Sequence, residues 1–341
     1  MSAGRRFPPA LGLLLAALLA ACGSGVGSRS TPAFGVALDG CPVTPAMIET
    51  AKASTGLPVR LVLFYAQWPA DPAAQQEPPT KSLEAIRAAG AVPCITWEPM
   101  SIGADGTETA IPAERILAGD YDGYITAFAR AIRDFGFPVL LRLAHEMNLQ
   151  RYHWGTAKAG YGPKSPELYK AVFRHVAERF RAQGARNALL VFCPNADSVP
   201  PADWNTASAY YPGDRYVDVL GMDGYNWGTT HTKAVQGYDS SFRPFREIFA
   251  PLHRELKALA PAKPVMVFET ASASTGGDKA RWAAEAFNTA AAWGLAAVVW
   301  FDVDKEQDWP LRKGAAQDPA PGVRPHVGDD PAWLDKIVGR P

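Results

Sequence analysis

The chain has 341 residues, of which 48% are hydrophobic and 11% aromatic, enough for one large core or two average domains. Its 34 basic and 34 acidic side chains balance to a formal net charge of zero, which provides no electrostatic attraction for nucleic acid or for an anionic surface. Ten tryptophans are enough to supply both a core and a groove for the flat apolar faces of sugar rings.

The first 33 residues are typical of an export signal followed by a linker. An apolar run at 11–20 follows two arginines and is too short to anchor the chain permanently across a bilayer. The run leads to Cys22 and resembles a bacterial lipoprotein signal, so we expect a signal peptide over 1–21, a lipidated Cys22 and a flexible linker over 22–33. The protein would then be exported to the cell envelope and touch the membrane only through its lipid anchor. An ordinary secretory peptide with a chance cysteine is the alternative.

From residue 34 onward, short apolar runs alternate with amphipathic segments that have helical spacing, as in 120–136, 165–184 and 278–294. Eight runs are typical of strands covered on both faces, at 34–40, 60–68, 92–99, 139–148, 188–195, 217–226, 264–272 and 296–304. Eight such units in roughly 300 residues predict an α/β fold with one catalytic domain over 34–341, a (β/α)₈ TIM barrel. A doubly wound open sheet is the alternative, but no nucleotide-binding loop follows any of these strands.

Polar and aromatic side chains gather at the carboxyl ends of the predicted strands, whereas the strand starts are plainly apolar. In a (β/α)₈ barrel the carboxyl ends form the face that carries function. Two of them carry the glutamates Glu146 and Glu269. The other candidate site residues at these ends are Trp97, Arg142, His145, Asn148, Asp223, Tyr225, Trp227 and Trp300.

Two of these carboxylates suit one reaction. Side chains alternate along a strand, so Arg142 and Glu146 share one face of the fourth strand, while Glu269 lies across the barrel on the seventh. Glycoside hydrolysis needs one carboxyl group that protonates the leaving oxygen and another that attacks the anomeric carbon or activates water. We therefore expect Glu146 to be an acid with a raised pKa, and Glu269 to be ionised and held by donors such as Arg142 or Tyr225. The alternative is a purely structural ion-pair network with Arg142.

Other chemistries have weaker support in the sequence. HEMNL begins like a zinc-protease helix, but Leu149 stands where the second histidine belongs. The six histidines and four cysteines show no metal-ligand spacing, and no serine-hydrolase elbow occurs. We therefore expect no metal and no cofactor. We also expect a monomer whose partner is a polysaccharide or oligosaccharide.

The motif RLAHEMN, followed by YHWG, resembles the fourth-strand motif of glycoside hydrolase family 26, the β-mannanase family. ITWEP, PN, DGYNW, VFETAS and VVWFDVDKEQDW extend the likeness in the same order over most of the chain. The resemblance implies a retaining hydrolase with Glu146 as acid/base and Glu269 as nucleophile. It also implies active-site positions for Arg142, His145, Asn148, Asp223, Tyr225 and Trp309, the last as the floor under the sugar. For Trp97, Trp227 and Trp300, sugar stacking and core packing both remain open.

One departure from the family pattern concerns the substrate. Mannanases usually continue HEMN with a glycine and, two residues later, a tryptophan, whereas Leu149, Gln150 and Arg151 follow Asn148 here. We expect an endo-acting β-glycanase, with β-1,4-mannan as the first substrate and mixed-linkage β-glucan or β-xylan as alternatives. A non-catalytic carbohydrate-binding lipoprotein of the envelope is the alternative from a different class.

Overall fold

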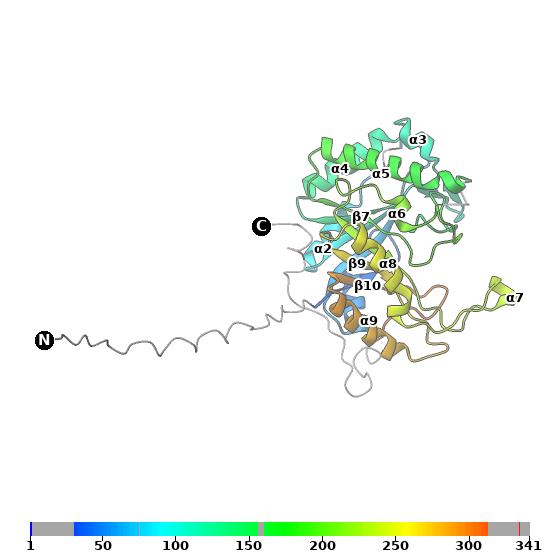
Figure 1. Ribbon diagram of the computed structural model, residues 1–341. Coiled ribbons are helices and arrows are strands. Elements are labelled where there is room, and N and C mark those ends of the chain that lie inside the picture. The colour runs from blue at the N-terminus through cyan, green and yellow to red at the C-terminus, as the bar shows by residue number, and fades with distance from the viewer. Residues whose placement is uncertain (2–30, 75, 156–159, 313–333, 335–341) are drawn as a thin grey trace.

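Eight parallel strands close into a barrel in the computed structural model, which describes residues 1, 31–74, 76–155, 160–312 and 334 (Figure 1). Neighbouring strands in the barrel follow one another along the chain, and the first pairs with the last, so the barrel is closed. The strands are β1 (Ala33–Ala37), β2 (Val59–Gln67), β3 (Val92–Glu98), β6 (Val139–Leu143), β7 (Ala188–Phe192), β8 (Val219–Asp223), β9 (Val265–Thr270) and β10 (Ala297–Phe301). The predicted (β/α)₈ barrel is confirmed.

Helices surround the barrel, and their ends carry ordinary capping signals. Thr44 accepts a hydrogen bond from the backbone of Met47 at the start of the first helix, and Asp278 does the same for Arg281 at the start of the last. Gly136 and Gly294 end two helices with φ of 69°, a conformation that glycine adopts without cost. The helices are α1 (Pro45–Thr55), α2 (Thr80–Ala88), α3 (Ala113–Leu117), α4 (Asp122–Phe135), α5 (Ser165–Ala182), α6 (Ala207–Tyr210), α7 (Lys233–Gln236), α8 (Phe245–Leu259) and α9 (Lys279–Trp293).

The alternation of side chains along each strand divides the core into two layers. Thr96 of β3 points into the barrel, where it contacts Arg142, while the next residue, Trp97, points outward against α4 and α5. Aromatic residues fill much of the outer layer between the strands and the helices. Among the described residues, no helix has the length and apolarity needed to cross a membrane.

Some local features differ from the sequence-based expectation. A small hairpin, β4 (Met100–Ile102) with β5 (Glu108–Ala110), follows β3 and was not predicted, because strands of three residues are too short to show a period. The strand predicted over 139–148 ends at Leu143, and the residues after it form a loop. The signal peptide and Cys22 belong to residues 2–30, outside the described residues.

Candidate active site

Arg142 is the fully buried centre of the candidate site at the carboxyl end of the barrel. One amino group donates to Asp223 Oδ2 at 2.5 Å and the other donates to Glu269 Oε1. Thr96 Oγ1 accepts from Nε at 3.0 Å and from Nη2 at 2.7 Å. Burial alone would lower the pKa of Arg142, but Asp223 and Glu269 outweigh it and hold the pKa well above its ordinary value. A permanent cation is thus fixed beneath the barrel mouth.

Glu269 lies at the carboxyl end of β9, and every hydrogen bond it makes here is one it accepts. Tyr65 donates its hydroxyl to Oε1 at 2.7 Å and Tyr225 donates to Oε2 at 2.5 Å, beside the bond from Arg142. Burial and then the charge of Glu269 raise the pKa of both phenols well above the ordinary value, so they remain protonated donors. Three donors around one carboxylate are what a charged nucleophile needs to be held in a single orientation.

Glu146 is presented by a loop with an unusual backbone. Its φ is 50°, and that of Ala144 is 47°, in the left-handed region that residues other than glycine rarely occupy. The loop is tied to both neighbouring strands, because Ala144 N donates to Trp97 O at 3.0 Å and Glu146 N donates to Cys193 O at 2.8 Å. These bonds hold the glutamate at the mouth beyond the end of β6.

The carboxyl group of Glu146 is suited to giving and taking a proton near neutrality. Burial, and next the charge of Glu269, raise its pKa to about 7. The side-chain amide of Asn195 donates to Oε1 at 2.5 Å. A carboxyl group with this pKa is about half protonated at pH 7, whereas an ordinary glutamate would be almost fully ionised.

Asn148 is buried beside the loop after β7. It is 1% exposed, and its amide exchanges two hydrogen bonds with the backbone of Asn195, each 2.9 Å long. It therefore braces the loop after β7 and acts on Glu146 through Asn195, rather than facing a ligand. Asn195 was not among the predicted site residues, although its position at the end of a predicted strand is the signal that identified the others.

His145 is a neutral ring in this site. Burial lowers its pKa well below the ordinary value, and the charges of Arg142 and Arg151 add to this effect. Nε2 lies 2.9 Å from the Tyr152 hydroxyl, and Nδ1 lies 4.0 Å from Glu98 Oε1. Of Arg142 and His145, for which the resemblance implied active-site positions, Arg142 carries the positive charge, because a protonated His145 would be enclosed beside the guanidinium.

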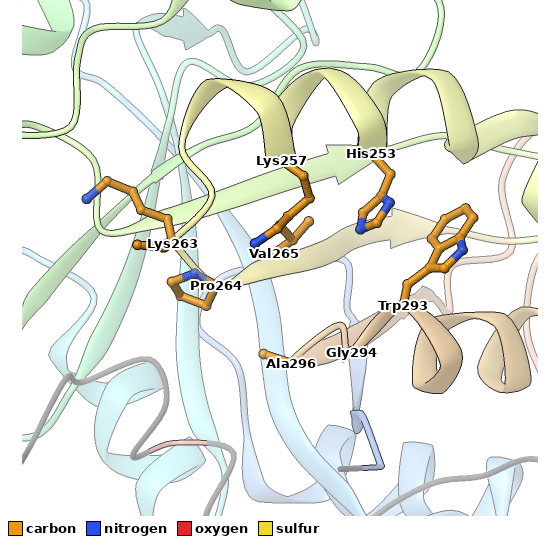
Figure 2. A pocket seen from close by; sticks show the side chains of 9 residues that line it. His253, Lys257, Lys263, Pro264, Val265, Trp293, Gly294 and Ala296 are labelled. Carbon is orange, nitrogen blue, oxygen red and sulfur yellow. The ribbon is translucent and has the colours of Figure 1, made fainter. Parts of the chain in front are cut away.

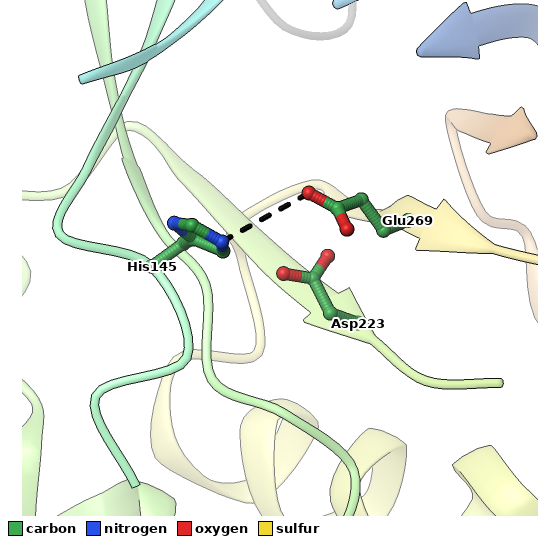
Figure 3. A group of neighbouring side chains, drawn as sticks. All are labelled: His145, Asp223 and Glu269. Atoms are coloured by element: carbon green, nitrogen blue, oxygen red, sulfur yellow. Dashed lines mark ion pairs between the residues drawn. The ribbon is translucent and has the colours of Figure 1, made fainter. Parts of the chain in front are cut away.

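Together with Asp223 and Glu269, His145 brings three metal-ligating groups within 4.8 Å of one another (Figure 3). The two carboxylates of this cluster already receive hydrogen bonds from Arg142. The guanidinium therefore supplies the positive charge that a metal ion would bring to this place.

The four predicted tryptophans divide between the mouth and the core. Trp227 and Trp309 lie 4.9 Å apart between ring centroids, and both are near Tyr225. Trp97 stacks on Phe128 at 4.4 Å outside the barrel and is fully buried. Trp300 is also fully buried, edge-on to a tryptophan of α9. Both core tryptophans point outward because strand alternation turns them away from the mouth.

The residues that replace the usual glycine and tryptophan after Asn148 form an ordered loop against the hairpin β4–β5. Arg151 makes two hydrogen bonds to the Glu108 carboxylate, at 3.0 and 2.6 Å. Trp154 donates to the carbonyl of His145 at 2.7 Å and stacks on Tyr152 at 4.7 Å. Trp154 is thus nearly buried and supports His145, so it does not provide an open platform for a sugar.

Two further residues of the site were not among the predicted site residues. Tyr65 of β2 donates to the Glu269 carboxylate, and no residue of that strand was a candidate. Glu98 at the end of β3 accepts a hydrogen bond from Gln67 at 2.6 Å, and burial raises its pKa to about 7. Both are polar groups that follow apolar residues in a strand, which is the signal that would have found them.

A separate cavity of about 220 Å³ lies at the opposite end of the barrel (Figure 2). It is bordered by the last turns of α8 and α9 and by the start of β9. Its lining includes His253, Lys257, Lys263 and Trp293. Because Glu269 lies at the other end of β9, this cavity is not part of the candidate site.

Several known proteins are similar to this chain in sequence. A sequence model described as glycosyl hydrolase family 26 matches residues 95–266. Endoglucanase H of Acetivibrio thermocellus is 36% identical over 230 residues, covering 66% of this chain and 23% of that protein. A mannan endo-1,4-beta-mannosidase of Bacillus subtilis is 36% identical over 115 residues, covering 32% of this chain and 28% of that protein. This chain thus spans about a quarter of the length of these curated relatives.

Solved structures agree on the fold. A mannanase of Bacillus subtilis superposes with a TM-score of 0.56 at 17% identity, covering 88% of this chain and 92% of that one. The catalytic domain of an endo-beta-1,4-mannanase of Bacillus sp. JAMB-750 gives a TM-score of 0.59 at 17% identity, covering 91% and 85%. The family match ends at residue 266, before Glu269, so the role of this carboxylate rests on its position and on the hydrogen bonds that it accepts.

Proposed function

Because the chain belongs to glycosyl hydrolase family 26, we propose that it is an endo-acting β-glycoside hydrolase that cleaves with retention of configuration. One observation carries the proposal: of the two carboxyl groups at the barrel mouth, one is placed to accept hydrogen bonds and the other to hold a proton. Glu269 is surrounded by donors, and Glu146 has a pKa of about 7 because of burial and the charge of Glu269. These are the states that a nucleophile and an acid require in the first step of such a reaction.

In the first step, a Glu269 oxygen attacks the anomeric carbon as the bond to the leaving oxygen breaks. Glu146 gives its proton to that oxygen, so the departing sugar leaves as a neutral alcohol and the glycosyl group stays on Glu269 as an ester. In the second step, Glu146 takes a proton from water, the water oxygen attacks the same carbon, and Glu269 leaves as a carboxylate. Each step inverts the anomeric carbon, so the product retains the β configuration.

The neighbours of the two glutamates support these roles. Arg142, Tyr65 and Tyr225 fix the attacking carboxylate, and the bond to Asp223 keeps Arg142 from moving toward the substrate. Neutral His145 avoids a second positive charge, which would oppose the cationic character that the sugar develops in the transition state. A preorganised site of this kind supplies much of the stabilisation of that state.

Replacing Asn195 by alanine tests the support of the acid. The amide favours the ionised form of Glu146, so its loss should raise the pKa of Glu146 further. Glu146 must be protonated for the first step, so the fall of kcat/KM with rising pH should shift to higher pH. The maximal kcat/KM should drop by about 10- to 100-fold because the acid is less well positioned.

Ser198→Ala is the matched control for this variant, because Ser198 lies in the same loop as Asn195. Its hydroxyl accepts a hydrogen bond from Asn148 and does not contact Glu146. It should leave the basic limb of the pH profile in place. An unchanged limb in Asn195→Ala would contradict the assigned contact between Asn195 and the acid.

The substrate we propose is β-1,4-mannan, supported by the resemblance of the RLAHEMN motif and by the mannan endo-1,4-beta-mannosidases among the relatives. Mixed-linkage or other β-glucan is the second candidate. It is favoured by the match over 230 residues to Endoglucanase H, and by the loop that Arg151 joins to Glu108 in place of the usual glycine and tryptophan.

Initial rates on mannan, glucomannan, mixed-linkage glucan and xylan at equal concentration decide between these polymers. Release of long oligosaccharides early in the reaction supports endo action, and release of monosaccharide alone would contradict it. No turnover on any polymer would overturn the proposed reaction and leave the non-catalytic alternative.

We also propose that the protein is attached to the membrane by a lipid on Cys22, which rests on the signal-like sequence before that residue. A Cys22→Ser variant should appear in the soluble fraction of the envelope, as measured by fractionation and immunoblotting. Recovery of the variant with the membranes in the same proportion as the parent protein would contradict lipid attachment.

A further inference from the structure

A long loop between β8 and α8, residues 228–243, leaves the body of the protein as an arm (Figure 1). The short helix α7 lies at the tip, well away from the barrel in this view. The arm begins directly after Tyr225 and Trp227, which follow Asp223, the last residue of β8. It therefore starts at the edge of the candidate active site.

Hydrogen bonds within the arm fix its shape. His231 and Ser240 pair across it, with His231 N donating to Ser240 Oγ at 3.0 Å and Ser240 N donating to His231 O at 3.2 Å. Near the tip, Lys233 N donates to Asp239 Oδ1 at 2.8 Å. At its base, Thr229 N donates to Thr275 O in the loop after β9 at 3.2 Å. These bonds join the two sides of the arm to each other and its base to the loop after β9.

Aromatic rings continue from the active site along the arm. Tyr225, which donates to Glu269, is 6.1 Å from Trp227 between ring centroids. Trp227 is 4.3 Å from His231, and His231 is 5.1 Å from Tyr238 in an edge-to-face arrangement. The Tyr238 hydroxyl lies 2.5 Å from His231 Nδ1, which fixes the orientation of the phenol ring. Tyr238 is nevertheless 52% exposed.

We propose that Tyr238 is a remote stacking site for the glycan chain, beyond the sugars next to the cleaved bond. The proposal rests on the proposed function and extends it to a surface some distance from the two glutamates. A tyrosine ring offers an apolar face to a sugar, and little conformational entropy is lost because its hydrogen bond already orients it.

The surroundings of Tyr238 favour a glycan over an apolar protein partner. Besides Tyr238, two apolar residues of the tip are exposed, Ala234 and Val235, the latter 78% exposed, and the other exposed residues are Gly237 and the polar Thr232, Lys233, Gln236 and Asp239. A single exposed aromatic ring with several hydrogen-bonding groups around it matches a polyhydroxylated chain, whereas a protein interface needs a larger apolar centre. The row of rings leads back to Tyr225, so a glycan bound along it would reach the nucleophile.

The test compares long and short substrates in three variants. Tyr238→Ala should raise KM for the polysaccharide that the enzyme degrades fastest by about three- to tenfold, a loss typical of one aromatic contact. It should leave kcat/KM unchanged for an aryl glycoside, which is too short to reach the arm. Tyr238→Phe keeps the ring but loses the hydrogen bond that orients it, so its KM should lie between those of the parent enzyme and Tyr238→Ala. Val235→Ser removes apolar surface without a ring and should have little effect.

A binding measurement separates this proposal from the proposed reaction. In the Glu269→Gln background, affinity electrophoresis in gels containing each of the four polysaccharides should show weaker retardation when Tyr238 is alanine. If the parent enzyme hydrolyses nothing but Tyr238→Ala still weakens retardation, the reaction is wrong and the binding site stands.

Three results would overturn the remote site. One is an equal loss of activity on polysaccharide and aryl glycoside, and another is no loss on either substrate. The third is a dimer in sedimentation analysis that Tyr238→Ala dissociates without a change in polysaccharide binding, which would assign the arm to contact between copies of the chain.

Discussion

Replacing Glu269 by alanine is expected to reduce hydrolysis of every polysaccharide by at least about 10⁴-fold, because the bond to the anomeric carbon can no longer form. The change removes the group that accepts from Arg142, Tyr65 and Tyr225, and leaves a space where the carboxylate stood. Initial rates of reducing-end release on the preferred polymer measure the loss. Substantial residual turnover would sink the assignment of Glu269 as nucleophile.

A small anion provides the control for loss of the fold. Azide that enters the vacated space should attack the anomeric carbon of an activated aryl glycoside and give an α-glycosyl azide, since only one inversion then occurs. Tyr65→Phe is a matched variant that keeps the nucleophile and loses one donor. It should retain far more activity than Glu269→Ala, and the same thermal midpoint in both variants would exclude unfolding as the cause.

Replacing Glu146 by alanine should have the second largest effect, and one that depends on the leaving group. Hydrolysis of polysaccharide should fall by about 10²- to 10⁴-fold, since the leaving sugar needs a proton that only the acid delivers. The first step on an aryl glycoside with an acidic phenol should persist, because that phenolate leaves without a proton. Burst amplitude and steady-state rate, measured separately, distinguish the two steps.

The pH profile gives this prediction its sign. Burial and the charge of Glu269 raise the pKa of Glu146 to about 7, so the acid is present below that pH and is lost as the pH rises through it. The kcat/KM of the parent enzyme should therefore decline above about pH 7, and Glu146→Ala should lack this decline. A decline at the same pH in the variant would assign it to another group, with Glu98 the first to test.

The barrel could be predicted because each strand is a short apolar run between recognisable helices. The hairpin β4–β5 escaped prediction, since three-residue strands have no measurable period. Arg142, Glu146 and Glu269 could be predicted because each interrupts or ends an apolar run. A buried charge persists only where partners hold it, so such a residue indicates a functional site. The structure brings these residues together at one end of the barrel.

The remaining site residues depended on information that is absent from a linear pattern. Side chains in a strand alternate between the barrel interior and the helix-facing side. An error of one residue in the predicted register therefore moves Trp97 or Trp300 from one side to the other. Asn148 lies two residues after the acid, but its amide is used by the backbone of Asn195, and such a contact between two loops has no sequence spacing. Only the folded chain distinguishes a residue that faces substrate from one that braces its neighbour.

The left-handed backbone on either side of His145 has a consequence for heat resistance. Such a conformation costs an L-residue about 1–2 kcal/mol relative to the right-handed one, and Ala144 and Glu146 both adopt it. Glycine would relieve this cost at either position, but at Glu146 the relief would remove the proton donor. These two conformations therefore lower the free energy of unfolding. In a more thermostable variant that keeps its activity, glycine can remove this cost only at Ala144.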